Sequence, residues 1–306
     1  MMSNFNFDVV NQVLILFVII FIGIIAKKKD YLSKEINKGI SNILVDITLP
    51  LLVISSYTAK YSKAMINDVG KVFMLSMLIN IVLILLSKII FSKFPKNERN
   101  ILKFVTVFSN CGFMGFPVLE SLYGKTAVFY GSIFNITFNL FMFTYGIMLF
   151  TNKTDVKHFK RILINPVIIC TGIGLLIFRF SIKLPIPIDR AINMVGSMTT
   201  PLSMLIIGAM LADINIKAAV MGYKVYLVSF LRLIAAPLIT LTLLNFIGVN
   251  GLILKVLVVI QAMPAAATAA VFTEKYGGNE SLTSRCILMT TVFSIITIPV
   301  IISMIN

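Results

Sequence analysis

The sequence predicts an all-α integral membrane protein with ten transmembrane helices. Three observations lead to this prediction: 58% of the 306 residues are hydrophobic, only 13% are charged, and the mean hydropathy is +0.97. A soluble domain carries about 25% charged residues. About half that share, in a chain of this length, is too few charged residues to cover the surface of a soluble protein. We therefore expect a multi-pass protein of the cell membrane, that is, the cytoplasmic membrane.

Apolar segments long enough to cross a bilayer follow one another along nearly the whole chain. A hydrocarbon core of roughly 30 Å needs about 20 helical residues. Ten segments meet this requirement, and because they consume most of the chain, no soluble domain is expected. They lie near residues 8–26, 40–59, 71–91, 102–122, 127–150, 163–180, 191–212, 221–247, 252–273 and 284–305.

The basic residues predict the orientation of these spans. Lys27, Lys28 and Lys29 follow the first span directly and no Lys or Arg precedes it, so this span is not a cleavable signal peptide. With the N-terminus outside, the inside connections hold 18 of the 27 Lys and Arg residues and the outside connections hold 8. Inside connections carry such an excess in membrane proteins. Both termini are therefore expected on the extracytoplasmic face.

The composition argues against several other classes of protein. One His and three widely spaced Cys provide no metal-ligand cluster and no disulfide framework. The net charge of +15 is interpreted as a topology signal, so no nucleic-acid partner is expected. No GxxxxGK[ST] motif occurs, and only Asp46 and Arg232 lie well inside the spans. We expect neither an enzyme nor a bound cofactor.

The two halves of the chain carry signs of an internal repeat. Gly124 and Gly277 each follow a Tyr, after the fourth and the ninth span, and they are 153 residues apart. A unit of five spans crosses the membrane an odd number of times, so its second copy is inserted upside down. Inverted repeats of this kind are typical of secondary transporters. The predicted five-helix repeats are residues 1–153 and 154–306.

Spans four and nine, corresponding members of the two repeats, are interrupted. Asn110, Gly112, Gly115 and Pro117 lie in the middle of span four, and Pro264 lies at mid-depth in span nine. Gly frees the backbone and Pro removes a donor, so about two turns are expected to unwind. Paired interruptions indicate a transport site where half-helix N-termini face an anionic group. The alternative is that these residues merely kink the helices.

At these residues the chain resembles the auxin efflux carrier family, within the bile acid/sodium symporter-like ten-helix carriers. The similarity is carried by Asn110 with the run Met114–Pro117, by Met263-Pro264, by Asn165-Pro166, and by Arg232 with Pro237. The resemblance implies a scaffold built from helices 1, 2, 6 and 7. It implies a mobile transport domain of helices 3–5 and 8–10, in which the two broken helices cross at their prolines. It also implies a homodimer and an elevator-type movement.

The same resemblance suggests the class of substrate. Plant members have a long hydrophilic loop where this chain has only about residues 151–162, and they commonly have Gln where this chain has Ala265. Short-loop bacterial relatives are associated with small dicarboxylates. The predicted substrate is therefore a small organic anion such as malate or malonate, with auxin-like acids less favoured. An ion channel or a transporter-fold sensor is the alternative.

Two sets of residues are predicted to form the transport site. Asn135 and Asn139 share a helix face, Gln261 and Thr268 flank Pro264, and the resemblance adds Tyr145. The substrate-binding candidates are Asn110, Gly112, Gly115, Pro117, Asn135, Asn139, Tyr145, Gln261, Pro264 and Thr268.

The candidates for coupling or charge balance are Asp46 and Arg232. Asp46 is interpreted either as a site for a coupling H⁺ or Na⁺, or as a hydrogen-bond partner of a helix end or of an Arg. Arg232 is interpreted either as an anion-binding charge or as a structural tie to helix carbonyls. Each lies about 12 Å deep at 1.5 Å per residue, so a pair between them is permitted.

Overall fold

The computed structural model describes residues 2–58, 63–151, 163–212, 222–276 and 278–305. Within these ranges the regular structure is helical apart from one isolated β-bridge, which confirms the all-α prediction. The predicted boundary between the repeats, at residues 153 and 154, lies outside the described residues. So does the short connection predicted at 151–162, apart from Thr151.

The chain forms two compact units, which are described separately below. The first unit contains Met1–Phe73, Gly112–Asn135 and Leu163–Asp213. The second unit contains Met74–Cys111, Ile136–Ile162 and Ile214–Asn306. The helices α4 (Lys63–Ile90) and α6 (Phe116–Phe141) contribute to both units.

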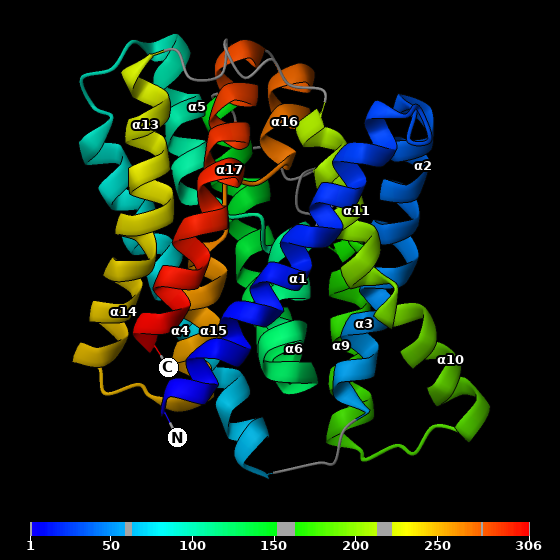
Figure 1. The fold of residues 1–306 in the computed structure, drawn as a ribbon. Helices are drawn as coiled ribbons and strands as arrows, with labels where there is room; N and C mark the ends of the chain where they lie inside the picture. Colours follow the sequence, from blue (N-terminus) through cyan, green and yellow to red (C-terminus); the bar gives the residue numbers. More distant parts are fainter. Residues whose placement is uncertain (1, 59–62, 152–162, 213–221, 277, 306) are drawn as a thin grey trace. The chain divides into compact units, whose positions relative to one another are not determined.

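In the first unit, α1 packs along α11 (Figure 1). Two glycines allow this close approach, because a Cβ on Gly208 would overlap the carbonyl oxygen of Ile20 and one on Gly23 would lie 2.5 Å from the carbonyl oxygen of Leu205. Small residues at helix contacts serve this purpose in membranes. The elements of this unit are α1 (Met2–Lys28), α2 (Lys34–Ile43), η1 (Leu44–Thr48), α3 (Leu49–Tyr57), α9 (Pro166–Arg179), α10 (Ile186–Ser197) and α11 (Thr199–Ala212), with most of η2 (Cys111–Gly115).

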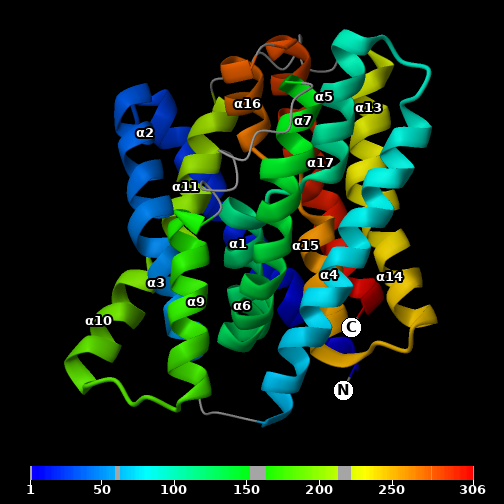
Figure 2. The same ribbon diagram turned by 180° about the vertical axis from the view of Figure 1, so that it is seen from behind.

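The second unit is built around aromatic side chains. The ring of Phe104 lies 4.7 Å from that of Phe108 and 5.3 Å from that of Phe272, measured between centroids. Figure 2 shows α5, α13 and α17 of this unit side by side. Its elements are α5 (Lys96–Val107), η3 (Met142–Gly146), α7 (Ile147–Thr151), α13 (Tyr223–Phe230), η4 (Leu231–Ala235), α14 (Ala236–Phe246), α15 (Gly251–Ala262), α16 (Thr268–Tyr276) and α17 (Glu280–Ile305).

Seven described segments are long and apolar enough to cross a membrane, compared with the ten spans predicted. Three features account for the difference. The second half of predicted span four continues with predicted span five in one segment of 41 residues, Cys111–Thr151, about twice the length a bilayer needs, while the first half of span four belongs to α5. Gly124, with φ of 69°, interrupts it. Predicted span six is the 14-residue helix α9, and predicted span nine is divided into α15 and α16.

Three of the four described π-helical turns precede a proline by the same interval. The turns η1, η2 and η4 end two residues before Pro50, Pro117 and Pro237. A proline ring clashes with the carbonyl four residues earlier and supplies no N–H to it. A wider turn relieves that clash, and π turns inside α-helices are frequent at functional sites.

Substitution of Gly208 tests the packing of α1 on α11. We expect Gly208→Val to lower the free energy of unfolding by at least about 2 kcal/mol, since a side chain there meets backbone that cannot yield. The matched control is Gly172→Val on α9, where an added Cβ has open space. Thermal unfolding in detergent measures both. Equal midpoints for the two variants would contradict the packing described here.

Candidate functional site

Both interrupted segments break over a short extended stretch within the second unit. The helix α5 ends at Val107, and Phe108 has φ of −93° and ψ of 116°. The helix α15 ends at Ala262, and Met263 has φ of −68° and ψ of 149°. The second break follows from the sequence, because the residue before a proline is disfavoured in the α conformation. The first break has no proline beside it.

The two extended stretches cross and pair with each other. Ser109 and Ala265 form an antiparallel β-bridge. The Asn110 N–H donates to the carbonyl oxygen of Pro264 at 2.7 Å, and the Ala266 N–H donates to that of Phe108 at 2.9 Å. Backbone that leaves a helix at membrane depth must find other partners. Here each break supplies the partners of the other.

A side chain from α17 satisfies one further donor at the crossing. The Ala265 N–H donates to Thr290 Oγ1 at 3.1 Å, and the same hydroxyl donates to the Cys286 carbonyl oxygen at 2.8 Å. Thr290 and Ala265 are both fully buried. The helix α17 therefore holds the crossing in place.

Arg232 connects the C-terminal ends of the two half-helices. Its side chain is 0% exposed. Nη1 donates to the carbonyl oxygens of Thr106 at 2.9 Å and Val107 at 2.8 Å, in the last turn of α5. Nη2 donates to the carbonyl oxygen of Gln261, in the last turn of α15, and to its side-chain Oε1. The four described hydrogen bonds of Arg232 therefore end on carbonyl and amide oxygens rather than on a carboxylate.

This arrangement has an electrostatic consequence. The end of a helix carries about half an elementary charge, negative at the C-terminus. Two such ends together match the single positive charge of one guanidinium. A buried cation is costly unless it is paired or fully hydrogen-bonded. Arg232 meets that condition at Nη1 and Nη2 through the helix ends, while its buried Nε has no hydrogen-bond partner among the described residues. The last carbonyls of α5 and α15 gain donors that the helices lack.

The comparison with known proteins identifies the family. The model of the family described as membrane transport protein matches residues 8–302. The chain belongs to this transporter family. The resemblance to the auxin efflux carriers is thereby confirmed, as is the expectation of a multi-pass membrane transporter rather than an enzyme.

Two archaeal proteins are similar to this transporter over nearly its whole length. An uncharacterized transporter of Methanocaldococcus jannaschii is 26% identical over 296 residues, covering 94% of this chain and 95% of the relative. An uncharacterized transporter of Methanothermobacter thermautotrophicus is 23% identical over 295 residues, with 94% and 95% coverage.

The transporter's crossing gathers several of the predicted site residues. Asn110, Gln261 and Pro264 take part directly, through the contacts given above. Thr268, the first residue of α16, donates to the sulfur of Met142 on η3 at 3.5 Å. Asn110 is 9% exposed, and Gln261 and Pro264 are buried.

Asn139 and Tyr145 belong to the same unit. Asn139 follows Phe138, whose ring centroid lies 5.6 Å from that of Phe108 at the crossing. Tyr145 lies on η3, and the amine of Lys88 is 5.5 Å from the centre of its ring. Both predicted residues are buried.

The remaining predicted residues belong to the first unit. Gly112 and Gly115 lie on η2, Pro117 is the second residue of α6, and Asn135 is buried further along that helix. Asp46 lies on η1 with its side chain exposed. Each of the four described π turns thus contains a predicted site residue, since η3 holds Tyr145 and η4 holds Arg232.

Two predictions about the fourth segment are wrong. The expected unwinding of about two turns is limited to Phe108–Asn110, and Cys111–Gly115 remains helical as a π turn. Among the described glycines, positive φ occurs at 124, 222, 248 and 251 and not at 112 or 115. The crossing is next to Pro264 as predicted, but on the other segment it lies at Ser109, eight residues before Pro117.

Several residues at the crossing gave no signal in the sequence. Thr106 and Val107 contribute only carbonyl oxygens, which any residue type supplies. Ser109 lies in the extended pair without a proline or glycine beside it. Thr290 resembles other hydroxyl residues of its helix, such as Thr291, Ser294 and Ser303, which bond to the backbone of that helix.

Arg232 provides the first test of the site. We expect Arg232→Leu to lower the free energy of unfolding by about 3–5 kcal/mol, because four buried acceptors lose their donor. Arg232→Lys keeps the charge but not the planar fork, so we expect an intermediate loss. Arg179→Leu, at an exposed Arg, is the control. If Arg232→Leu unfolds at the same midpoint temperature as the wild type, the hydrogen bonds of Arg232 to the two helix ends are not needed for stability.

Thr290 provides a second test with a close control. We expect Thr290→Val to cost about 1–3 kcal/mol, since the buried Ala265 N–H loses its acceptor. Thr291→Val changes the neighbouring hydroxyl, which bonds only to Ile287 of its own helix at 2.7 Å among the described contacts, and we expect a smaller effect. Denaturant unfolding in detergent separates the two. The reverse order of the two losses would rule out the proposed support of the crossing.

Proposed function

We propose that this transporter carries a small organic anion, a carboxylate such as malate or malonate, across the cytoplasmic membrane by elevator-type alternating access. Auxin-like acids are less favoured substrates. The proposal rests on a difference between the helix ends at the crossing: the partial charges of the C-terminal ends are balanced by an opposite charge, and those of the N-terminal ends are not balanced within their own first turns. The C-terminal ends of α5 and α15 share the positive charge of Arg232. The N-terminal ends of the segments that follow have no comparable partner of opposite charge within their own first turns.

The two N-terminal ends lie close to the paired stretch in sequence. The turn η2 begins at Cys111, directly after Asn110, and α16 begins at Thr268, three residues after Ala265. Neither has an acidic residue in its first turn. Helix N-termini present N–H groups and partial positive charge to anions. In this proposal the Thr268 hydroxyl and the Asn110 side-chain amide orient the carboxylate.

The elevator mechanism is supported by the division of the chain. The segments expected to form the scaffold, helices 1, 2, 6 and 7, correspond to α1, α2–α3, α9 and α10–α11, which all belong to the first unit. Most of predicted helices 3, 8, 9 and 10 belongs to the second unit. Gly112–Asn135 groups with the first unit, although the resemblance assigns it to the transport domain.

Further parts of the proposal rest on the resemblance and on the sequence pattern. They are ten membrane crossings arranged as two inverted repeats, extracytoplasmic termini and a homodimer. The pairing of segments four and nine supports the repeat, because these are corresponding members of the two halves. The proposed coupling ion is H⁺ or Na⁺, and Asp46 on η1 is its proposed site in the first unit.

Transport by reconstituted protein tests the proposal through the charge at Thr268. We expect saturable uptake of one dicarboxylate among labelled malate, malonate, indole-3-acetate and an uncharged sugar. Thr268→Glu places a negative charge at the start of α16, which stabilises the helix but repels the anion. We expect its KM to be at least about tenfold higher than that of Thr268→Gln, equivalent to about 1.4 kcal/mol. Gln has the shape of Glu without the charge, and both variants lack the hydroxyl, so the comparison isolates the charge.

Two controls complete this experiment. Asn110→Ala at the crossing should reduce uptake, whereas Asn245→Ala, at an exposed position on α14, should not. Equal uptake by the Glu and Gln variants at position 268 would refute anion binding at this helix end. Unitary currents in a planar bilayer would favour the channel alternative, since carriers turn over too slowly to produce them.

A further inference from the structure

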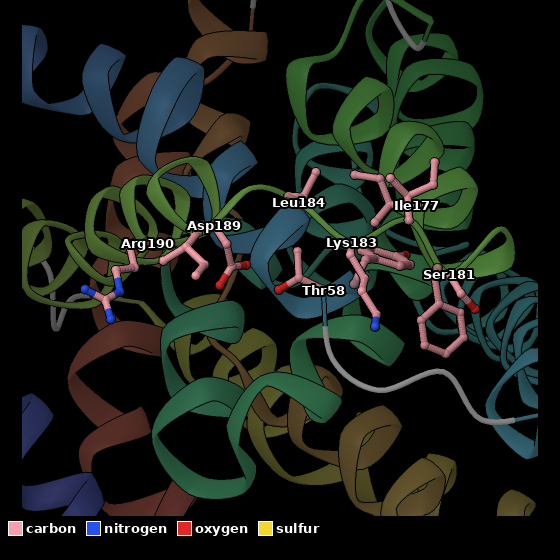
Figure 3. A pocket seen from close by; sticks show the side chains of 11 residues that line it. Thr58, Ile177, Ser181, Lys183, Leu184, Asp189 and Arg190 are labelled. Atoms are coloured by element: carbon pink, nitrogen blue, oxygen red, sulfur yellow. The ribbon is translucent and has the colours of Figure 1, made fainter.

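A pocket lies in the first unit, formed only by residues of that unit. Its volume is about 650 Å³, within the range of small-molecule sites. The ends of α3 and α9, the connection after α9 and the start of α10 line it. Figure 3 shows Asp189 and Arg190 on one side and Lys183 and Ser181 on the other.

The inner wall of this pocket is rigid. Tyr57 and Phe178 line it and are 1% and 2% exposed. The Tyr57 hydroxyl hydrogen-bonds with that of Ser132 at 2.6 Å, and its ring centroid lies 4.7 Å from that of Phe129. The ring also packs directly on Gly174, where a Cβ would overlap it. A wall fixed in this way needs no rearrangement to receive a ligand.

The connection that carries Lys183 is also fixed. The Ile182 N–H donates to the Ile177 carbonyl oxygen at 3.0 Å, which closes the end of α9. Ser181 has φ of 51°, a left-handed conformation that costs a non-glycine residue about 1–2 kcal/mol. Two prolines at 185 and 187 fix the backbone that follows. Pre-organisation of a loop lowers the entropic cost of binding.

The charges of the pocket match a phosphate. Lys183 and Arg190 are exposed, and neither forms an ion pair among the described residues. With Asp189 they leave one net positive charge. Arg offers a planar fork for phosphate oxygens and Lys offers a point charge. The Asp189 carboxylate and the Ser181 hydroxyl suit the hydroxyl groups of a polar headgroup.

The position of the pocket matches a lipid. Tyr57 ends one candidate membrane span and Ile186 begins another, so the pocket lies at the edge of the apolar zone. Its other walls are aliphatic, at Ile177, Ile182 and Leu184. Basic pockets between transmembrane helices bind anionic headgroups on the cytoplasmic side of membranes, and the same pairing of cations with phosphate applies at the opposite face. An amphiphile satisfies both the cations and the apolar wall, whereas a small free anion satisfies only the cations.

We propose that this pocket binds an anionic phospholipid, with the phosphate at Lys183, the rest of the headgroup extending toward Arg190 on the opposite side of the pocket, and the glycerol and acyl region against Ile177, Ile182 and Leu184. The site is separate from the crossing and is independent of the substrate carried. It gives the first unit a specific contact with one lipid class at the membrane edge. It also provides a role for two basic residues in a connection predicted to be extracytoplasmic, where basic residues are otherwise sparse.

Native mass spectrometry of the delipidated full-length protein tests this proposal. The probes are phosphatidylglycerol, phosphatidylethanolamine, phosphatidylcholine and inorganic phosphate. We expect phosphatidylglycerol to bind most tightly and the double variant Lys183→Gln/Arg190→Gln to bind it about thirtyfold more weakly, since each basic residue near a membrane surface contributes about fivefold. The matched control is Lys71→Gln/Arg179→Gln, which removes two exposed cations of the same unit that do not line the pocket.

A second variant keeps both cations and tests the apolar wall. Leu184→Glu places a negative charge against the glycerol and acyl region, where it is costly to bury and repels the anionic headgroup, and we expect a loss of binding similar to that of the double variant. Wild-type elution on size exclusion shows that each variant is folded. Equal binding of the three phospholipids, unchanged binding in the double variant, or binding of inorganic phosphate as tight as that of phosphatidylglycerol would each overturn the proposal.

Discussion

The crossing depends on one buried guanidinium. Extended backbone at membrane depth leaves carbonyl groups without helical partners, and no lipid group replaces them. The β pairing satisfies Phe108 and Pro264, but the last turns of α5 and α15 would still present unpaired oxygens. Arg232 donates to three of these carbonyls and to one side-chain amide. Arg232 therefore ties the two half-helices to each other at their breaks.

The π turns show how the helices accommodate proline without breaking. Pro50, Pro117 and Pro237 each come two residues after such a turn, and the chain continues as α-helix beyond each of them. The widened turn moves a carbonyl away from the proline ring and redirects the side chains of the turn. For η4 this change is directly useful, since Arg232 lies within the turn. The same backbone defect that tolerates Pro237 therefore helps to aim the guanidinium.

The sequence was sufficient to predict the helical class, the family and one of the two breaks. Pro264 determines its own break through local chemistry, because it lacks a donor and restricts Met263. The break at Ser109 has no such local cause. It is stabilised by Ala265, which is 156 positions further along the chain, and no single-sequence pattern reveals that pairing. Pro117 was misleading because the preceding π turn η2 accommodates its ring and the chain continues as helix into α6.

The charge balance at the crossing also bears on the proposed substrate. Two helix N-termini supply about one positive charge together. A monoanion would be neutralised by them, whereas a dicarboxylate would retain about one negative charge at membrane depth, which is costly. Arg232 does not provide the missing charge, because its described hydrogen bonds are made to the helix C-termini. A dicarboxylate carried through this site therefore calls for a companion cation, and for this reason the proposed substrate class favours coupling to H⁺ or Na⁺ over simple uniport.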